Sequence, residues 1–109
     1  MHQTPLAAYM ILGWMIVHGG QEPPPGAVGG ARAQAAAALS DPRLASPDTR
    51  ARLGEEFKIL FVVVHAGWLS AQREGSLDRY ANGLAEIFSK QDGLDLRRMG
   101  LGRAGFQSS

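Results

Sequence analysis

The sequence contains no cysteine, and this absence excludes several kinds of chemistry. Disulfide bonds, thiol nucleophiles and zinc sites with cysteine ligands all need a residue that this chain lacks. The charges favour neither sign, because 11 Lys and Arg residues against 10 Asp and Glu residues give a formal net charge of +1. Nucleic-acid-binding domains usually present a broad basic surface. We therefore expect no nucleic-acid partner.

The motifs of common enzyme classes are also missing. No serine lies in a GxSxG sequence, and no GxxxxGK[ST] phosphate loop occurs. The histidines, His2, His18 and His65, do not have the local spacing of metal ligands. Glu55 and Glu56 are adjacent, so they point about 100° apart on a helix and cannot face each other as an acid/base pair. We expect a protein that is not an enzyme and holds no cofactor or metal.

The chain is long enough for one compact domain over residues 1–109, and its 45% hydrophobic and 19% charged residues are typical of a folded one. Hydrophobic periodicity and helix start and stop signals predict an all-α fold. We expect a small four-helix domain with one long central helix and an extended C-terminal arm. The predicted helices cover approximately residues 5–18, 26–39, 47–74 and 77–92, and the arm covers 94–109.

The first helix is apolar from Leu6 to Val17 at nearly every angular position, which predicts burial on most sides. A stretch of this length spans about 18 Å, short of the ~30 Å hydrocarbon core, so we expect no membrane span. A signal peptide is the alternative interpretation. It is disfavoured because no basic residue precedes the stretch and no A-x-A-like site follows it. Thr4 is the expected N-cap, and Gly19 and Gly20 end the helix.

The middle of the chain leaves two alternatives open. Residues 25–39 are mostly Ala and Gly, which predicts a helix packed closely on the first or third helix, with a flexible linker as the alternative. Ser40 to Pro42 is a predicted turn.

Ser46 and Pro47 signal the start of the third helix, which then carries a core-facing apolar stripe. Its other faces are also apolar between Ile59 and Leu69, so we expect neighbours on several sides. A strand over residues 59–64 is the competing interpretation.

The last predicted helix begins after Ser76, the expected N-cap, and ends before Gly93. It has a clean apolar stripe with charged residues on its other faces. The arm that follows is expected to pack back on the helices, and the final residues 107–109 are expected to be disordered. The apolar anchors of this arm are Leu96, Met99, Leu101 and Phe106.

Two groups of residues are candidates for a binding role. The first group lies in the apolar helices and would form a binding surface or cavity: Met10, Trp14, Phe57, Phe61, His65 and Trp68. Each tryptophan is expected in the core with its indole N–H bonded to a carbonyl, or else at the surface as a binding hot spot. His65 is expected at the core boundary, with a ligand or pH-switch role as the alternative. The second group is a basic cluster suited to solvent or to an acidic protein partner: Arg97, Arg98 and Arg103.

The order of elements and several short sequences carry a family resemblance. They are the apolar first helix with Tyr9 and Trp14, the Pro/Gly connection, the Ala-rich helix, the Leu-Gly-Glu-Glu-Phe-Lys-Ile start of the third helix and the Leu-Gly-Arg-Ala-Gly-Phe ending. The chain resembles the C-terminal helical domain of an uncharacterised family of exported bacterial proteins. The resemblance implies an all-α domain in the periplasm or outside the cell. It also implies that the chain is a fragment without its own export signal, and it carries no catalytic residues.

Three functions are compatible with these features. The favoured one is recognition of a protein partner, or formation of a homodimer, through exposed apolar residues between Ile59 and Leu69 or on the first helix. It predicts an exposed apolar patch larger than roughly a few hundred Å². The alternative is a carrier of a small apolar ligand or lipid, with a cavity between helices. A third possibility is an enzyme with a site assembled around His65 and Glu55 or Glu56.

Overall fold

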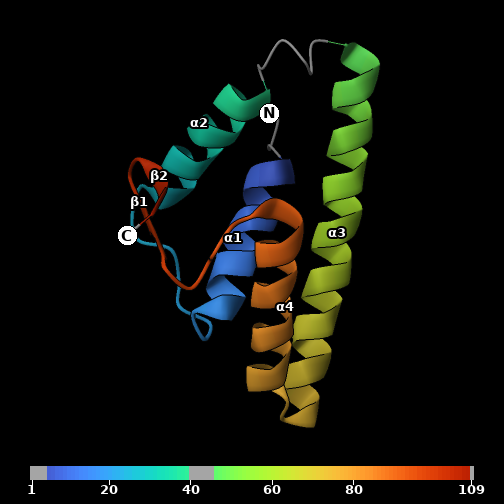
Figure 1. Ribbon diagram of the computed structural model, residues 1–109, viewed down its shortest axis with the longest axis vertical. Helices are drawn as coiled ribbons and strands as arrows, with labels where there is room; N and C mark the ends of the chain where they lie inside the picture. The colour runs from blue at the N-terminus through green and yellow to red at the C-terminus, as the bar shows by residue number, and fades with distance from the viewer. Residues whose placement is uncertain (1–4, 40–45, 109) are drawn as a thin grey trace.

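The structure is a computed structural model that describes residues 5–39 and 46–108 (Figure 1). Within these ranges the prediction of a small four-helix all-α domain with a long third helix is confirmed. Each helix begins and ends within one residue of its predicted range. In chain order the elements are α1 (Pro5–Val17), α2 (Ala27–Leu39), α3 (Pro47–Glu74), α4 (Leu77–Asp92), β1 (Met99–Gly102) and β2 (Gly105–Ser108).

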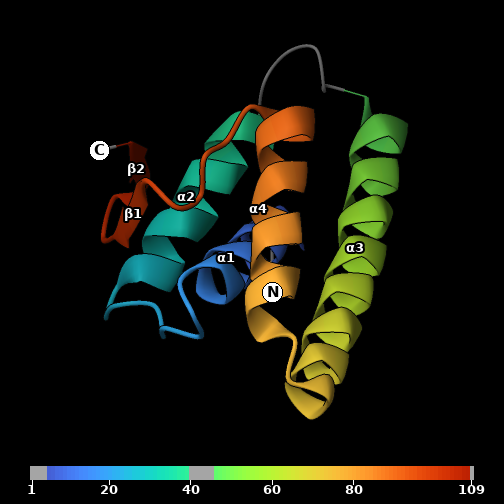
Figure 2. The ribbon, with the colours of Figure 1, turned by 60° about the horizontal axis from the view of Figure 1, so that its bottom comes forward.

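Helix α1 is the middle element of the domain, with α2 on one side and α3 and α4 on the other (Figures 1 and 2). Its side chains enter two separate apolar cores. Tyr9, Leu12 and Ile16 belong to the first core, whose other buried members are Val64, Leu84, Phe88 and Leu96. Trp14 belongs to the second core, whose other buried members are Ala27, Ala31, Leu101 and Phe106. The helix is therefore buried on most sides, as its uniform apolarity predicts.

The first core centres on Phe88 and Leu96, both 0% exposed. The Phe88 ring stacks on Tyr9 with ring centroids 5.1 Å apart. A side chain at Gly13 would place its Cβ 2.8 Å from the Phe88 ring, so the glycine lets α1 and α4 approach each other. Burying a side chain of phenylalanine's size contributes roughly 1.5–3 kcal/mol. This close packing explains why a glycine stands in the middle of α1.

The Ala-rich segment forms helix α2, so the linker interpretation is wrong for residues 27–39. Its small residues pack on α1 as predicted, and also on the C-terminal hairpin. A Cβ at Gly30 would overlap the backbone of Arg103 and Gly105. Gln34 fixes this contact, because its Nε2 donates to the Phe106 carbonyl (2.9 Å) and its Oε1 accepts from the Phe106 N–H (2.8 Å). The side-chain amide of Gln34 thus makes the same pair of hydrogen bonds with the β2 backbone that a neighbouring strand would make.

The C-terminal arm packs back on the helices through its predicted anchors, but it is not simply extended. Strands β1 and β2 form an antiparallel hairpin in which Leu101 pairs with Phe106. Gly105, the first residue of β2 after the turn, adopts a φ of 91°, a conformation that glycine reaches without steric cost. The expectation of a disordered end is wrong for Gln107, which lies in β2.

The helix termini follow the predictions only in part. Gly75 and Gly93 end α3 and α4 with φ values of 73° and 67°, as left-handed C-caps do. Ser46 and Ser76 occupy the N-cap positions of α3 and α4 as predicted, but their hydroxyls make no capping hydrogen bond. The cap predicted at Thr4 and the turn predicted at residues 40–42 lie outside the described residues.

Helix α3 is the longest element, and it lies along one side of the domain (Figure 1). Its predicted core-facing side contacts α1 and α4, with Val64 and Ala71 buried and Phe57, Phe61 and Trp68 half-buried. Leu60, which the helical wheel also places in the core-facing stripe, is 40% exposed. The expectation of neighbours on several sides is wrong, because α1 occupies the central position instead.

Candidate functional site

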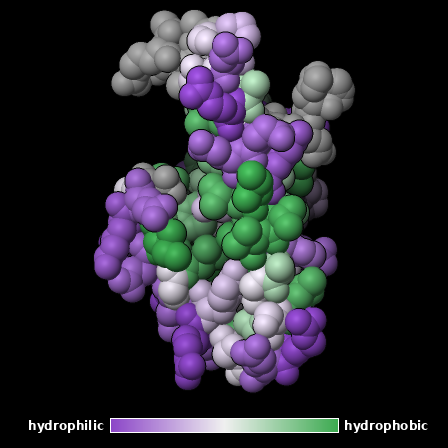
Figure 3. Space-filling view, turned by 90° about the vertical axis from the view of Figure 1, so that its right-hand side faces the viewer, coloured by the Kyte–Doolittle hydropathy of each residue, from purple (hydrophilic) through white to green (hydrophobic). Residues whose placement is uncertain are grey.

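The most prominent surface feature is an apolar face on the side of α3 that points away from the other helices (Figure 3). Three of its side chains are more than half exposed: Ile59 at 62%, Val62 at 64% and Val63 at 60%. Leu69 is 40% exposed, and Ala66 is exposed between Val62 and Leu69. We call the set Ile59, Val62, Val63, Ala66 and Leu69 the outer face. Large exposed apolar patches are typical of protein contact sites.

Charged side chains border the outer face at both ends, as the hydrophilic regions above and below it in Figure 3 show. Toward the helix N-terminus lie Glu55 and Lys58, whose Oε2 and Nζ atoms are 3.3 Å apart in an exposed ion pair. Toward the C-terminus lies the exposed Arg73, and near it Ser70 Oγ donates to Glu74 (3.0 Å). Each end of the outer face therefore carries charges of both signs.

This segment is the one for which a strand was the competing interpretation, and the structure shows a continuous helix. Isoleucine and valine favour strands, so their local preference does not explain the helix. The opposite side of the helix does, because Phe57, Phe61 and Val64 pack against the first core. Tertiary packing on one side therefore determines the conformation, and the branched residues on the other side are left exposed.

The aromatic candidates do not line a shared cavity. Trp14 is 3% exposed in the second core, and its indole Nε1 donates to the Met99 carbonyl at 2.9 Å. Phe57 packs on the first core and lies 5.9 Å from Tyr9. Trp68 is half-buried on the same core. The candidate set is thus divided between two cores on opposite sides of α1.

His65 lies at the core boundary on α3, where the sequence predicts it. Its ring stacks on Phe61 with centroids 6.0 Å apart and meets Trp68 edge-on at 6.2 Å. Glu55 lies ten residues earlier on the same helix, about 15 Å away along the axis. The structure therefore does not bring His65 together with either Glu55 or Glu56, and the described residues contain no group of three or more His, Cys, Asp or Glu that could hold a metal ion.

An apolar hollow of about 300 Å³ opens between α1, α2 and the hairpin. Met10 is the one member of the aromatic and apolar candidate set that lines it. The remaining lining residues are Leu6, Ala7, Ala31, Gln34, Ala35, Ala38, Leu94, Met99 and Phe106. The alanines of α2 create this space because their side chains are short. The contrast between the large side chains of α1 and the small ones of α2 is a sequence signal from which the hollow could have been predicted.

A second, more polar cleft of about 490 Å³ lies where α1 ends beside α3 and α4. Trp68 and Arg97 both line it, so it joins one member of each candidate group. The other polar side chains on its wall are Gln72, Asp78 and Asn82.

The three candidate arginines contact different elements. Arg97 Nη2 bonds Asn82 Oδ1 on α4, and Arg98 Nε lies 3.7 Å from Asp95 Oδ2 in an exposed ion pair. The Arg103 side chain lies over Gly26, just before α2, where a Cβ would be 3.0 Å from Arg103 Cγ. The arginines therefore contact three different parts of the chain: α4, the segment before β1 and the segment before α2.

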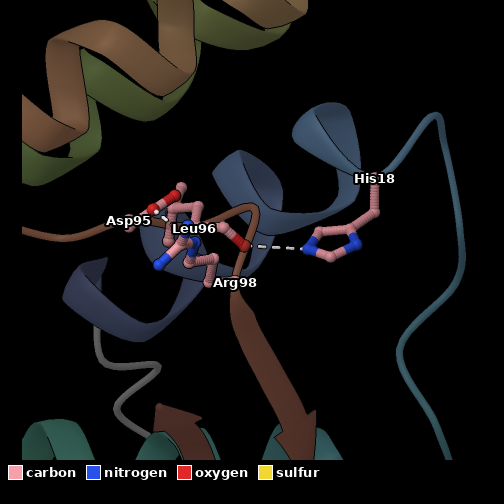
Figure 4. A network of polar contacts seen from close by, with 4 residues as sticks. All are labelled: His18, Asp95, Leu96 and Arg98. Carbon is pink, nitrogen blue, oxygen red and sulfur yellow. Dashed lines mark hydrogen bonds and ion pairs between the residues drawn. The ribbon is translucent and has the colours of Figure 1, made fainter. Parts of the chain in front are cut away.

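His18 has a structural contact that the sequence did not indicate. Its Nε2 lies 2.8 Å from the Leu96 carbonyl, next to the Asp95–Arg98 ion pair (Figure 4). Because a carbonyl only accepts, Nε2 carries the proton. The ring also stacks on Trp14 at 4.4 Å. His18 thus ties the end of α1 to the segment that leads into the hairpin.

Comparison with protein-family models, curated proteins and solved structures found no match. No helix among the described residues is long and apolar enough to cross a membrane. The resemblance to an exported bacterial family and the location that it implies stay predictions.

Proposed function

We propose that this protein is a non-enzymatic self-association module, and that its contact surface is the outer face of α3. The observation that carries the proposal is the exposure of Ile59, Val62 and Val63, each at 60% or more on one side of one helix. Apolar surface removed from water contributes roughly 25 cal/mol per Å², so covering these side chains favours association.

Helix propensity alone does not explain why branched residues occupy positions 59, 62 and 63. Branched side chains lose rotamer freedom in a helix, and valine and isoleucine have lower helix propensity than alanine or leucine. At positions 59, 62 and 63 they also gain little from burial inside one copy of the chain. A contact with another protein surface supplies the burial that the single chain lacks.

A second copy is the occupant that we propose. In a symmetric dimer each copy contributes the same patch, so an apolar centre always meets an apolar centre. One face of one helix is smaller than a standard interface, which buries roughly 1,200–2,000 Å² in total. We therefore expect a dimer that forms and dissociates with concentration, rather than an obligate one.

Sedimentation velocity over micromolar to millimolar protein tests the proposal. The wild type is expected to shift from monomer to dimer, and Val62→Asp is expected to stay monomeric because it places a charge in the apolar centre. The matched control is Val28→Asp, which changes a 44% exposed valine on α2 and should dimerise as the wild type does. Equal behaviour of the two variants, or a monomeric wild type throughout, would contradict the proposal.

The hollow between α1, α2 and the hairpin supports a second candidate function, that of a carrier for a small apolar ligand. Its volume is at the lower end of ligand pockets, roughly 300–1,000 Å³. We expect Ala38→Trp to fill the hollow and to abolish binding of a fluorescent fatty-acid probe. Ala36→Trp, on an exposed position of α2 outside the hollow, is the control. Absence of probe binding by the wild type would remove this candidate.

A further inference from the structure

The outer face of α3 is part of a longer seam with regular spacing. Starting at Glu55, its residues follow one another in alternating steps of four and three. This is the spacing of the core positions of a coiled coil, called a and d, which place side chains along one side of a helix. The six seam residues are Glu55, Ile59, Val62, Ala66, Leu69 and Arg73. The seam positions therefore have an apolar middle between two charged residues of opposite sign. Glu55, which is ion-paired with Lys58 beside the seam, stands at one end, and Arg73, which is followed by Glu74, stands at the other.

We propose that two copies of this chain pack antiparallel along this seam, as a short two-stranded coiled coil with its two-fold axis between Val62 and Ala66. The proposal rests on the self-association proposed above and adds its geometry. In this arrangement Ile59 lies opposite the partner's Leu69, and Val62 lies opposite the partner's Ala66. The layer of Ile59 and Leu69 thus contains two large side chains, and the layer of Val62 and Ala66 contains a branched and a small one.

The charges at the two ends specify the direction. In the antiparallel arrangement Glu55 lies opposite the partner's Arg73, and symmetry creates the same pair at the other end. The two residues are eighteen positions apart, about 27 Å along the helix, so the ion pairs flank the whole apolar middle. In a parallel arrangement Glu55 would meet its own copy, and so would Arg73. Like charges in direct contact disfavour that alternative.

The position of Val63 also supports a two-fold axis between Val62 and Ala66. It lies one residue after Val62, beside the seam, and it is 60% exposed. Because it is close to the middle of the seam, the two-fold axis brings it next to its own copy. The antiparallel arrangement thus covers the three most exposed side chains of the outer face together.

Charge reversal at the ends of the seam tests the direction, with dissociation constants measured by sedimentation equilibrium at low salt. Glu55→Arg and Arg73→Glu are each expected to weaken the dimer about tenfold, because each turns two attractive pairs into two repulsive ones. The double variant is expected to return to the wild-type value. Arg79→Glu, an exposed residue of α4, is the control for a change of net charge and should have no effect.

The lack of cysteine allows a direct measurement of the direction. We expect a mixture of the single variants Glu56→Cys and Ser70→Cys to be cross-linked into a heterodimer by a short bis-maleimide, while neither variant cross-links efficiently alone. In a parallel dimer each variant would cross-link with itself. That result would overturn the antiparallel geometry and leave the proposed self-association intact. The same conclusion would follow if Val62→Asp abolishes the dimer but the charge reversals have no effect on it. A monomeric wild type would overturn both.

Discussion

Helices α1 and α3 both contain long apolar stretches, yet they occupy different surroundings. Ile16 of α1 is 2% exposed, whereas Ile59 of α3 is 62% exposed. Helix α1 lies between two cores, and α3 has neighbours on one side. The comparison shows that an apolar helix is buried on all sides only if the topology supplies partners for each side. Among residues 5–39 and 46–108, no element covers the outer face of α3, and this is the basis of the proposed self-association.

The two isoleucines offer the sharpest test of this comparison. We expect Ile16→Ala to lower the free energy of unfolding by about 2–5 kcal/mol, because it leaves a cavity in the first core. Ile59→Ala removes the same atoms from the surface and is expected to change the free energy by no more than about 0.5 kcal/mol. Urea unfolding followed by circular dichroism, at a concentration where the protein is monomeric, measures both. Equal losses would mean that the outer face is covered within one chain.

The tryptophans repeat the comparison with a hydrogen bond added. We expect Trp14→Phe to lower the free energy of unfolding by about 1–3 kcal/mol, because the Met99 carbonyl loses its donor and the second core loses volume. Trp68→Phe on the half-buried site should cost about 1 kcal/mol or less. The same unfolding experiment compares them, and a larger loss at Trp68 would contradict the assignment of Trp14 to the more tightly packed site.

Two glycines of α3 differ in how much room the neighbouring helices leave beside them. A Cβ at Gly67 would lie 2.7 Å from Tyr80 Cζ, whereas a Cβ at Gly54 would meet nothing within 4 Å. We expect Gly67→Ala to lower the free energy of unfolding by about 1–3 kcal/mol through overpacking. Gly54→Ala should raise it by up to about 1 kcal/mol, because alanine favours the helix. Thermal unfolding of the two variants should therefore shift in opposite directions.

The smallest expected effect concerns Tyr80 of α4, whose hydroxyl donates to the Val64 carbonyl at 2.8 Å. Tyr80→Phe should lower the free energy of unfolding by about 0.5–1.5 kcal/mol at neutral pH. Burial raises the pKa of Tyr80 above its usual 10.0, so the folded protein holds this proton more tightly than the unfolded chain does. The wild type should therefore lose stability above pH 10, and the variant should lose less. A variant with the wild-type pH profile would show that Tyr80 does not cause the loss.

Much of the fold could be predicted because helices depend on local signals. Pro47 at the start of α3 and Gly93 after α4 mark boundaries through their own backbone preferences, which act wherever the chain folds. The hairpin was missed because its strands are only four residues long and depend on a tertiary contact. Gln34 supplies that contact from 72 residues away in the chain, and no local pattern indicates it.

The candidate surface was predicted as a region, between Ile59 and Leu69, but its exposed side was not. The helical wheel shows that these residues are apolar on several sides, and it cannot show which sides have neighbours. Trp14 and Trp68 illustrate the same limit, because both occur in apolar helices and only one is almost fully buried.

The helix boundaries and the apolar sides of the helices thus follow from the amino-acid order, since backbone preference and periodicity act over a few neighbouring residues. The helical conformation of residues 59–64 also depends on packing against the first core. Which helix is central and which apolar side faces solvent depended on the packing of segments far apart in the chain. The physical reason is that burial is a property of the assembled whole. Helix α1 meets α2, α3 and α4 at once, and after these contacts are made nothing in the described chain covers the outer face of α3.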